Sequence, residues 1–174
     1  MKRGSILFAS LMVGSIAYGK NQPATAHADL INSQGEKIGT AKLTQSRKGV
    51  EIVIDASKLP PGVHGFHFHT AGKCDPPDFQ TAEGHFNPEG KKHGLKNPDG
   101  PHAGDMQNLT VGADGTLKVK VLDPRVTLRE GKDSLFQPNG TAIVIHEKMD
   151  DDLTDPAGNS GNRIACGVIS KMSK

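Results

Sequence analysis

A chain of 174 residues with 34% apolar content can bury one hydrophobic core of modest size, so a single domain is expected. Its 21 glycines and 11 prolines interrupt the sequence too often for long helices and are typical of short strands joined by turns. The formal net charge is +2, and the lysines are scattered among acidic residues without a polybasic run, which argues against a nucleic-acid partner.

The first nineteen residues are typical of a secretory signal peptide. Lys2 and Arg3 form a short basic segment, and the mostly apolar run over 6–17 that follows is too short to span a bilayer. Without Lys2 and Arg3, basic and acidic residues are equal in number, so most of the apparent basicity belongs to this segment. We therefore expect an exported protein in a secreted, periplasmic or cell-envelope location, with no stable membrane association after cleavage.

The cleavage site is predicted after Gly19, because Ala17 and Gly19 are small residues at the two positions that matter. Ala26 and Ala28 offer a second site, and an uncleaved membrane anchor is the other alternative. The earlier site is preferred because the later one would remove most of a predicted strand. The expected mature domain is 20–174.

Eight short segments alternate apolar and polar residues or are rich in β-branched residues, which predicts strands. They are 24–30, 38–45, 50–55, 63–69, 106–111, 116–122, 141–147 and 163–169. Gly35, Gly49 and Gly115 lie in connecting turns where a positive φ favours hairpins. The prediction is an all-β fold, an eight-stranded antiparallel Greek-key barrel flattened like a sandwich.

Two connections are long, polar and without periodicity: 70–105 and 148–162. Long loops without regular structure in a compact domain are usually functional. Cys74 and Cys166 are the only cysteines, and since disulfides persist outside the cytosol we expect them to pair. In the chain-entropy model, a disulfide that closes the loop between Cys74 and Cys166 stabilises the folded state by roughly 4 to 5 kcal/mol.

Six of the eight histidines and one aspartate suggest a metal centre. Residues two apart on a strand share a face, so His67 and His69 can bind one ion while Phe66 and Phe68 point to the core. Three imidazoles and a carboxylate in the first long loop suit tetrahedral zinc, whereas an all-imidazole set suits copper. The predicted zinc set is His85, His93, His102 and Asp105, and the predicted copper set begins with His67, His69 and His146.

The number of donors suggests a shared ligand. Two four-coordinate ions need eight donor atoms, and seven residues supply eight only if one histidine uses both ring nitrogens. His85, the first loop histidine after the strand pair, is the preferred bridge. Any one histidine alone is more often structural, but seven such residues around two loops favour a metal centre. His27 and His64 do not fit and are expected to be structural or exposed.

Six motifs resemble the copper-zinc superoxide dismutase family over nearly the whole mature chain. In order they are Gly-Phe-His-Phe-His, Gly-His-Phe-Asn-Pro, Lys-His-Gly, His-Ala-Gly-Asp, Val-Ile-His-Glu-Lys and Gly-Asn-Arg-Ile-Ala-Cys-Gly-Val-Ile. The resemblance implies copper ligands His67, His69, His85 and His146, and zinc ligands His85, His93, His102 and Asp105. It also implies superoxide as the substrate and a disulfide between Cys74 and Cys166.

The resemblance implies further roles. Arg163 would lie beside the open copper position, and His85 would take part in proton transfer, so both are candidate catalytic residues. Asp150 would link a copper-ligand histidine to a zinc-ligand histidine, although it lies in an acidic run that could be merely solvated. The loop between Asp152 and Arg163 is shorter than in animal enzymes and lacks glutamate and lysine. Substrate steering would then fall to lysines elsewhere, such as Lys73, Lys91 and Lys92.

Two other functions remain as alternatives. A non-catalytic dismutase-like module could store or deliver copper, but such relatives often lose ligands and here every ligand position is filled. A zinc hydrolase is disfavoured, because His146 and Glu147 begin a helical zinc motif on a segment that reads as strand. A homodimer and a monomer both remain open.

Overall fold

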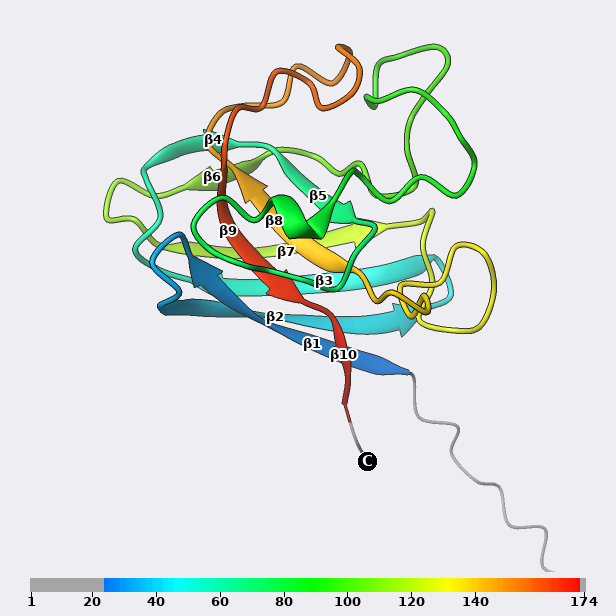
Figure 1. The fold of residues 1–174 in the computed structure, drawn as a ribbon, viewed down its shortest axis with the longest axis horizontal. Coiled ribbons are helices and arrows are strands. Elements are labelled where there is room, and N and C mark those ends of the chain that lie inside the picture. The colour runs from blue at the N-terminus through cyan, green and yellow to red at the C-terminus, as the bar shows by residue number, and fades with distance from the viewer. Residues whose placement is uncertain (1–23, 173–174) are drawn as a thin grey trace, which may run out of the picture.

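The computed structural model describes residues 24–172, so the predicted signal peptide lies outside the described residues (Figure 1). The strands are β1 (Thr25–Asn32), β2 (Lys37–Ser46), β3 (Gly49–Ala56), β4 (Gly62–His64), β5 (Phe66–His69), β6 (Leu109–Val111), β7 (Leu117–Asp123), β8 (Ala142–His146), β9 (Arg163–Val168) and β10 (Ser170–Lys171). One short 3-10 helix, η1 (Gln80–Ala82), lies in the first long loop. Within 24–172, no helix is long and apolar enough to cross a membrane.

The strands form a curled antiparallel sheet, as predicted. Its order is β5-β8-β9-β1-β2-β3-β7, with β10 added beside β1, and β4 pairs with β6 in a separate two-stranded sheet. The result is a half-barrel in which β6 and β7, although consecutive, belong to different sheets. Positive φ angles at Gly35 and Gly49 serve the β1-β2 and β2-β3 hairpin turns, as the sequence predicted. Gly115 also has a positive φ, but its turn joins β6 and β7, which do not pair with each other, so the hairpin expected there is wrong.

The core follows from the alternation of residues along the strands. On β1, Ala26, Ala28 and Leu30 are fully buried while the residues between them face outward. Phe66 and Phe68 on β5 are also fully buried in this core, as expected. Burial of each such large side chain contributes about 1.5–3 kcal/mol. The core therefore fixes β5 firmly, and with it the histidines that alternate with the two phenylalanines.

Two predicted strands differ from the structure. The segment 63–69 is broken at Gly65, where an added Cβ would lie 2.9 Å from Cβ of Ser160. The segment 106–111 is a strand only from Leu109, because the side chain of Asn108 instead pairs with the backbone of Asp150 at 2.8 and 2.9 Å. The short β10 was not predicted.

The two long loops lie together at one side of the sheet (Figure 1). Several contacts join them: the amide of Lys96 donates to the carbonyl of Asp152 at 2.9 Å, and the Lys96 and Asp152 side chains form an ion pair at 2.8 Å. The predicted disulfide between Cys74 and Cys166 is present and ties the first loop to β9. This side of the molecule is therefore anchored at several points.

Candidate metal centre

The histidines of the first group come from neighbouring strands and one loop. His67 and His69 lie on β5, which pairs with β8, the strand that ends in His146. The first loop returns to the edge of β5, where isolated bridges pair His69 with His85 and His67 with Asp105. Strand pairing thus brings together residues that are up to 79 positions apart in the sequence.

Among residues 24–172, one ring nitrogen of each of these four histidines is buried without a hydrogen-bond partner. The four atoms are Nδ1 of His67 and Nε2 of His69, His85 and His146. The four residues form a group whose possible ligand atoms lie within 4.8 Å of one another. Buried polar atoms are normally hydrogen-bonded, so four convergent lone pairs without partners are the arrangement that a metal ion satisfies.

The second nitrogen of each ring is held by the protein. Nδ1 of His69 donates to the carbonyl of Glu83 at 2.8 Å, and Nδ1 of His146 lies 3.3 Å from the carbonyl of Gly161. Nε2 of His67 lies 2.7 Å from Oδ2 of Asp150. These contacts fix the tautomer and orientation of each ring, so that the lone pair faces the centre of the group.

The second group surrounds Oδ1 of Asp105. Nδ1 atoms of His85, His93 and His102 lie 3.0, 3.1 and 3.3 Å from it, and those of His85 and His102 are 3.4 Å apart. With zinc–nitrogen bonds of about 2.0–2.1 Å, the edges of a ligand tetrahedron are about 3.3–3.4 Å, close to these separations. The residues present therefore fit zinc.

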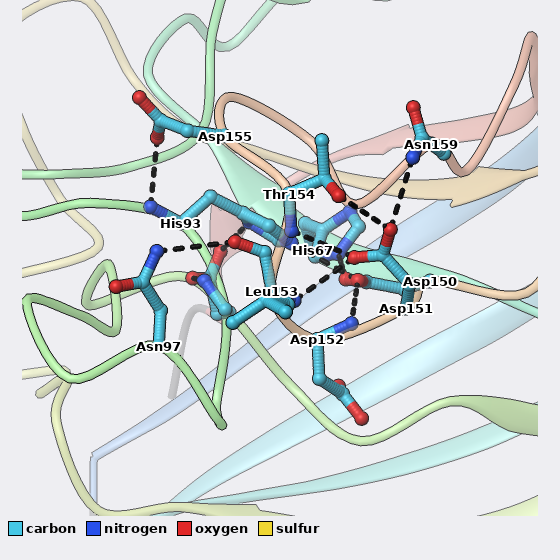
Figure 2. A network of polar contacts seen from close by, with 12 residues as sticks. His67, His93, Asn97, Asp150, Asp151, Asp152, Leu153, Thr154, Asp155 and Asn159 are labelled. Carbon is cyan, nitrogen blue, oxygen red and sulfur yellow. Dashed lines mark hydrogen bonds and ion pairs between the residues drawn. The ribbon is translucent and has the colours of Figure 1, made fainter.

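The two groups share residues. By distance alone, a second set of ligand atoms within 4.8 Å of one another comes from His67, His85, His93 and Asp105, so His67 and His85 belong both to this set and to the first group. The sequence had assigned His67 to copper alone, and His102 lies beside this group rather than within it. Asp150 also joins the two, because its Oδ1 lies 3.0 Å from Nε2 of His93 while its Oδ2 contacts His67 (Figure 2).

Comparison with known proteins agrees with this geometry. The family model "Copper/zinc superoxide dismutase (SODC)" matches residues 37–169. The chain belongs to the copper/zinc superoxide dismutase family. The predictions of family, fold, enzyme class and the two metals are therefore confirmed.

Relatives in this family cover most of the chain. Cu-Zn superoxide dismutase 1 of Aquifex aeolicus is 57% identical over 150 residues, 85% of this chain and 89% of that protein. Cu-Zn superoxide dismutase 2 of the same organism is 52% identical over 170 residues, 97% of this chain and 98% of that protein. A crystal structure of a SOD-like protein from Bacillus subtilis is 43% identical, with a TM-score of 0.80, and covers 82% of this chain and 96% of that one.

Burial keeps neutral the four imidazoles of the first group, here called the copper group: His67, His69, His85 and His146. It lowers the pKa of His85 and of His146 to about 3, with help from the neighbouring rings, and it lowers the pKa of His67 and His69 as well. His93 differs: burial opposes its protonation, but the carboxylates of Asp105 and Asp150 outweigh burial and raise its pKa to about 9. Neutral rings offer the lone pairs that metal binding requires.

Arg163 lies half-buried at the edge of the copper group. Its guanidinium donates to the carbonyls of Phe79 and Glu83, both at 2.6 Å. The carbonyl of Glu83 thus accepts hydrogen bonds from both Arg163 and the copper-group ring of His69. Burial lowers the pKa of Arg163, and the nearby charge of Asp78 opposes this, but the group stays a cation at neutral pH.

Sequence reasoning missed two residues that support the centre. Glu83 has φ 64° and ψ −149°, a backbone conformation that is essentially confined to glycine. Asp155 accepts a hydrogen bond from the amide of His93 at 2.8 Å (Figure 2). It also pairs with Lys92 at 3.0 Å. Only the clustering of acids in 150–155 gave a signal for Asp155, and the sequence held none for Glu83.

The remaining histidines behave as expected. His27 is exposed. His64 is buried, and its two ring nitrogens face the carbonyls of His146 and Pro60 at 2.8 and 2.9 Å. His64 therefore supports the backbone of a metal-group residue and offers no free nitrogen of its own.

Proposed function

We propose that the protein converts superoxide to dioxygen and hydrogen peroxide at a copper ion, next to a zinc ion. Copper would be held by His67, His69, His85 and His146, and zinc by His85, His93, His102 and Asp105. The observation that carries this proposal is the set of four buried ring nitrogens without partners, directly beside an aspartate oxygen ringed by three histidines.

His85 is the bridging residue in this proposal. Its Nδ1 faces Asp105 and His102 in the zinc group, whereas its Nε2 is one of the four unpartnered atoms of the copper group. His67 also belongs to both sets of close ligand atoms, but its Nε2 is bonded to Asp150, so only Nδ1 is left for a metal. His85 therefore has one ring nitrogen facing each metal group.

The chain's own residues bind the substrate and move a proton. Copper, when bound, supplies the one-electron redox chemistry that both half-reactions need. Arg163 would attract and orient the superoxide anion, because it is a cation fixed by two backbone carbonyls at the edge of the copper group. We propose that Nε2 of His85 takes up a proton from water and passes it to the reduced substrate. Asp150 would hold the His67 and His93 rings in orientation throughout.

A non-catalytic metal-binding module is the second candidate. One relative, 45% identical over 146 residues, carries the name "Superoxide dismutase-like protein" in Bacillus subtilis. Six of the seven predicted ligand residues lie in the two sets of close ligand atoms, and the seventh, His102, lies 3.3 Å from Asp105. Together with Arg163 beside the copper group, they favour the enzyme for this chain.

We also propose that the protein works outside the cytosol. The disulfide between Cys74 and Cys166 supports this location, since such bonds persist in oxidising compartments. The predicted signal peptide over 1–19 is checked by mass spectrometry of the processed protein, which should begin at Lys20. Sedimentation of the purified protein would separate a homodimer from a monomer.

The deciding experiment uses residues 20–174 loaded with copper and zinc. Elemental analysis should give one ion of each metal per chain, and pulse radiolysis should show rapid superoxide decay that slows as ionic strength rises. Two bound metals without superoxide decay would instead support the non-catalytic module. A chain that bound neither metal would contradict both functions.

A further inference from the structure

At the end of β7, outside both metal groups, buried Asp123 forms an ion pair with partly exposed Arg125. Asp123 is fully buried, and its Oδ1 accepts hydrogen bonds from the backbone amide of Arg125 at 3.0 Å and from Nη2 of Arg125 at 3.1 Å. Within residues 24–172, the other oxygen, Oδ2, has no hydrogen-bond partner, and neither has Nε of Arg125. An ion pair that leaves buried polar atoms unsatisfied contributes little to stability by itself. Its position in the fold therefore indicates another role.

The pair reaches the metal centre through the backbone. Nη2 of Arg125 also donates a hydrogen bond to the carbonyl oxygen of Asp105, the aspartate of the zinc group. Asp105 lies just before β6 and Asp123 ends β7, and these two strands belong to different sheets. The guanidinium therefore connects two chain segments that no strand ladder holds together.

Asp105 is held at several atoms, and Arg125 supplies one of the contacts. Its Oδ2 accepts hydrogen bonds from the amides of Gly94 and His102, each at 2.9 Å. These two donors lie in the same long loop as Asp105 and would move with that loop. The contact from Arg125 comes from the end of β7 and ties Asp105 to a second strand of the large sheet, in addition to its bridge with His67 on β5.

We propose that Asp123 and Arg125 are positioning residues for the zinc ligand Asp105. Asp123 orients the guanidinium, the guanidinium holds the Asp105 carbonyl, and Oδ1 of Asp105 stays aimed at His85, His93 and His102. The inference rests on the proposed zinc site. It predicts that zinc affinity depends on two residues that do not touch the metal.

The test compares zinc binding in full-length mature protein without copper. The variants are Arg125→Met, Asp123→Asn, their combination, the conservative Arg125→Lys, and the control Arg129→Met at an exposed position of the same loop. The zinc dissociation constant is measured by competition with a chromophoric chelator. The geometry of the site is followed through the visible absorption of cobalt(II) in its place.

We expect Arg125→Met to raise the zinc dissociation constant about 10- to 100-fold, as is typical when a partner that orients a ligand is removed. Arg125→Lys should recover part of the loss, because it keeps one donor. The double variant should lose little more than Arg125→Met, since the two residues act as one unit. The rise in Tm on adding zinc should also shrink, whereas a purely structural role would lower Tm equally with and without zinc.

The proposal is overturned if Arg125→Met binds zinc within twofold of the parent and gives the same cobalt spectrum. If that variant does not fold, Arg125→Lys and Asp123→Asn decide in the same way, and parent-like zinc affinity in both overturns it. A parent protein that bound neither zinc nor cobalt would contradict the proposed function, and it is recognised before any substitution is made.

Discussion

Oδ2 of Asp150 lies 2.7 Å from Nε2 of His67, with both side chains almost completely buried. The other oxygen contacts His93, so one carboxylate orients a ring of each metal group. We expect Asp150→Asn to weaken zinc binding about 10- to 100-fold, because the amide can accept only one of the two ring hydrogens. Competition with a chromophoric chelator measures this loss.

Asp151→Asn is the matched control for this prediction. Asp151 is the next residue in the same acidic run, but within the described part of the chain its carboxylate accepts hydrogen bonds only from Leu153, Thr154 and Asn159 of its own loop. Zinc binding close to the parent is expected for Asp151→Asn. Equal losses in both variants would mean that loop order, rather than the contact with the rings, controls the metal.

Glu83 carries backbone strain beside the copper group, so Glu83→Gly should stabilise the protein. The conformation costs a residue other than glycine about 1–3 kcal/mol, and the greater freedom of glycine in the unfolded chain returns about 0.4–1 kcal/mol. A net gain of roughly 1 kcal/mol is expected in the free energy of unfolding, measured by denaturant titration.

Two variants separate strain from other effects at Glu83. Glu83→Ala keeps the strained backbone and should leave stability near that of the parent. Glu130→Gly replaces an exposed loop glutamate that has no positive φ and should be neutral or destabilising. The strain explanation fails if Glu83→Gly is no more stable than Glu83→Ala.

The sequence predicted the strand part of the centre because its signals are local. A period of two along β5 sends Phe66 and Phe68 into the core and leaves His67 and His69 on the other face, and the structure has this arrangement. The turn glycines Gly35 and Gly49 likewise indicated the β1-β2 and β2-β3 hairpins. These features depend on neighbours in the sequence, so no knowledge of the folded chain was needed.

The supporting contacts could not be predicted in the same way. The carbonyl of Glu83 and the carbonyl of Asp105 act through backbone atoms, which every residue possesses, so no residue type marks them. Within the run 150–152, composition could not distinguish the carboxylate that contacts His67 from its neighbours. The histidine whose two ring nitrogens are both free to bind a metal is determined by the position of Asp150, which is a property of the tertiary structure.

The metal-free protein should be most stable near pH 6.5. His85 and His146 have folded-state pKa values of about 3 against 6.5 when unfolded, so the unfolded state binds more protons between these values and stability falls as pH drops below 6.5. Each histidine contributes a slope of up to about 1.4 kcal/mol per pH unit. His93, with a pKa raised to about 9, has the opposite sign: its contribution is complete below 6.5 and is lost as pH rises to about 9.

Thermal unfolding of metal-free protein at a series of pH values measures this profile. His27→Ala, at an exposed site, should leave its shape unchanged. A Tm that stayed constant from pH 6.5 down to 4.5 would contradict this prediction. It would mean that burial does not lower the pKa of His85 and His146 in the folded protein.

Substrate steering should depend on Arg163 far more than on Lys92. Lys92 was a candidate for steering, but it lies 3.0 Å from Asp155, and this carboxylate offsets its charge. Arg163 is held by backbone carbonyls, which leave its positive charge uncompensated by a direct carboxylate contact.

Because a focused positive field raises the capture rate of an anion by about 10- to 1,000-fold, we expect Arg163→Gln to lower the rate at least about tenfold at low ionic strength and to flatten its dependence on salt. Lys92→Gln should change the rate less than about twofold under the same conditions. Pulse radiolysis of fully metal-loaded variants at several salt concentrations tests both; a larger loss in Lys92→Gln than in Arg163→Gln would assign steering to the loop surface instead of the edge of the copper group.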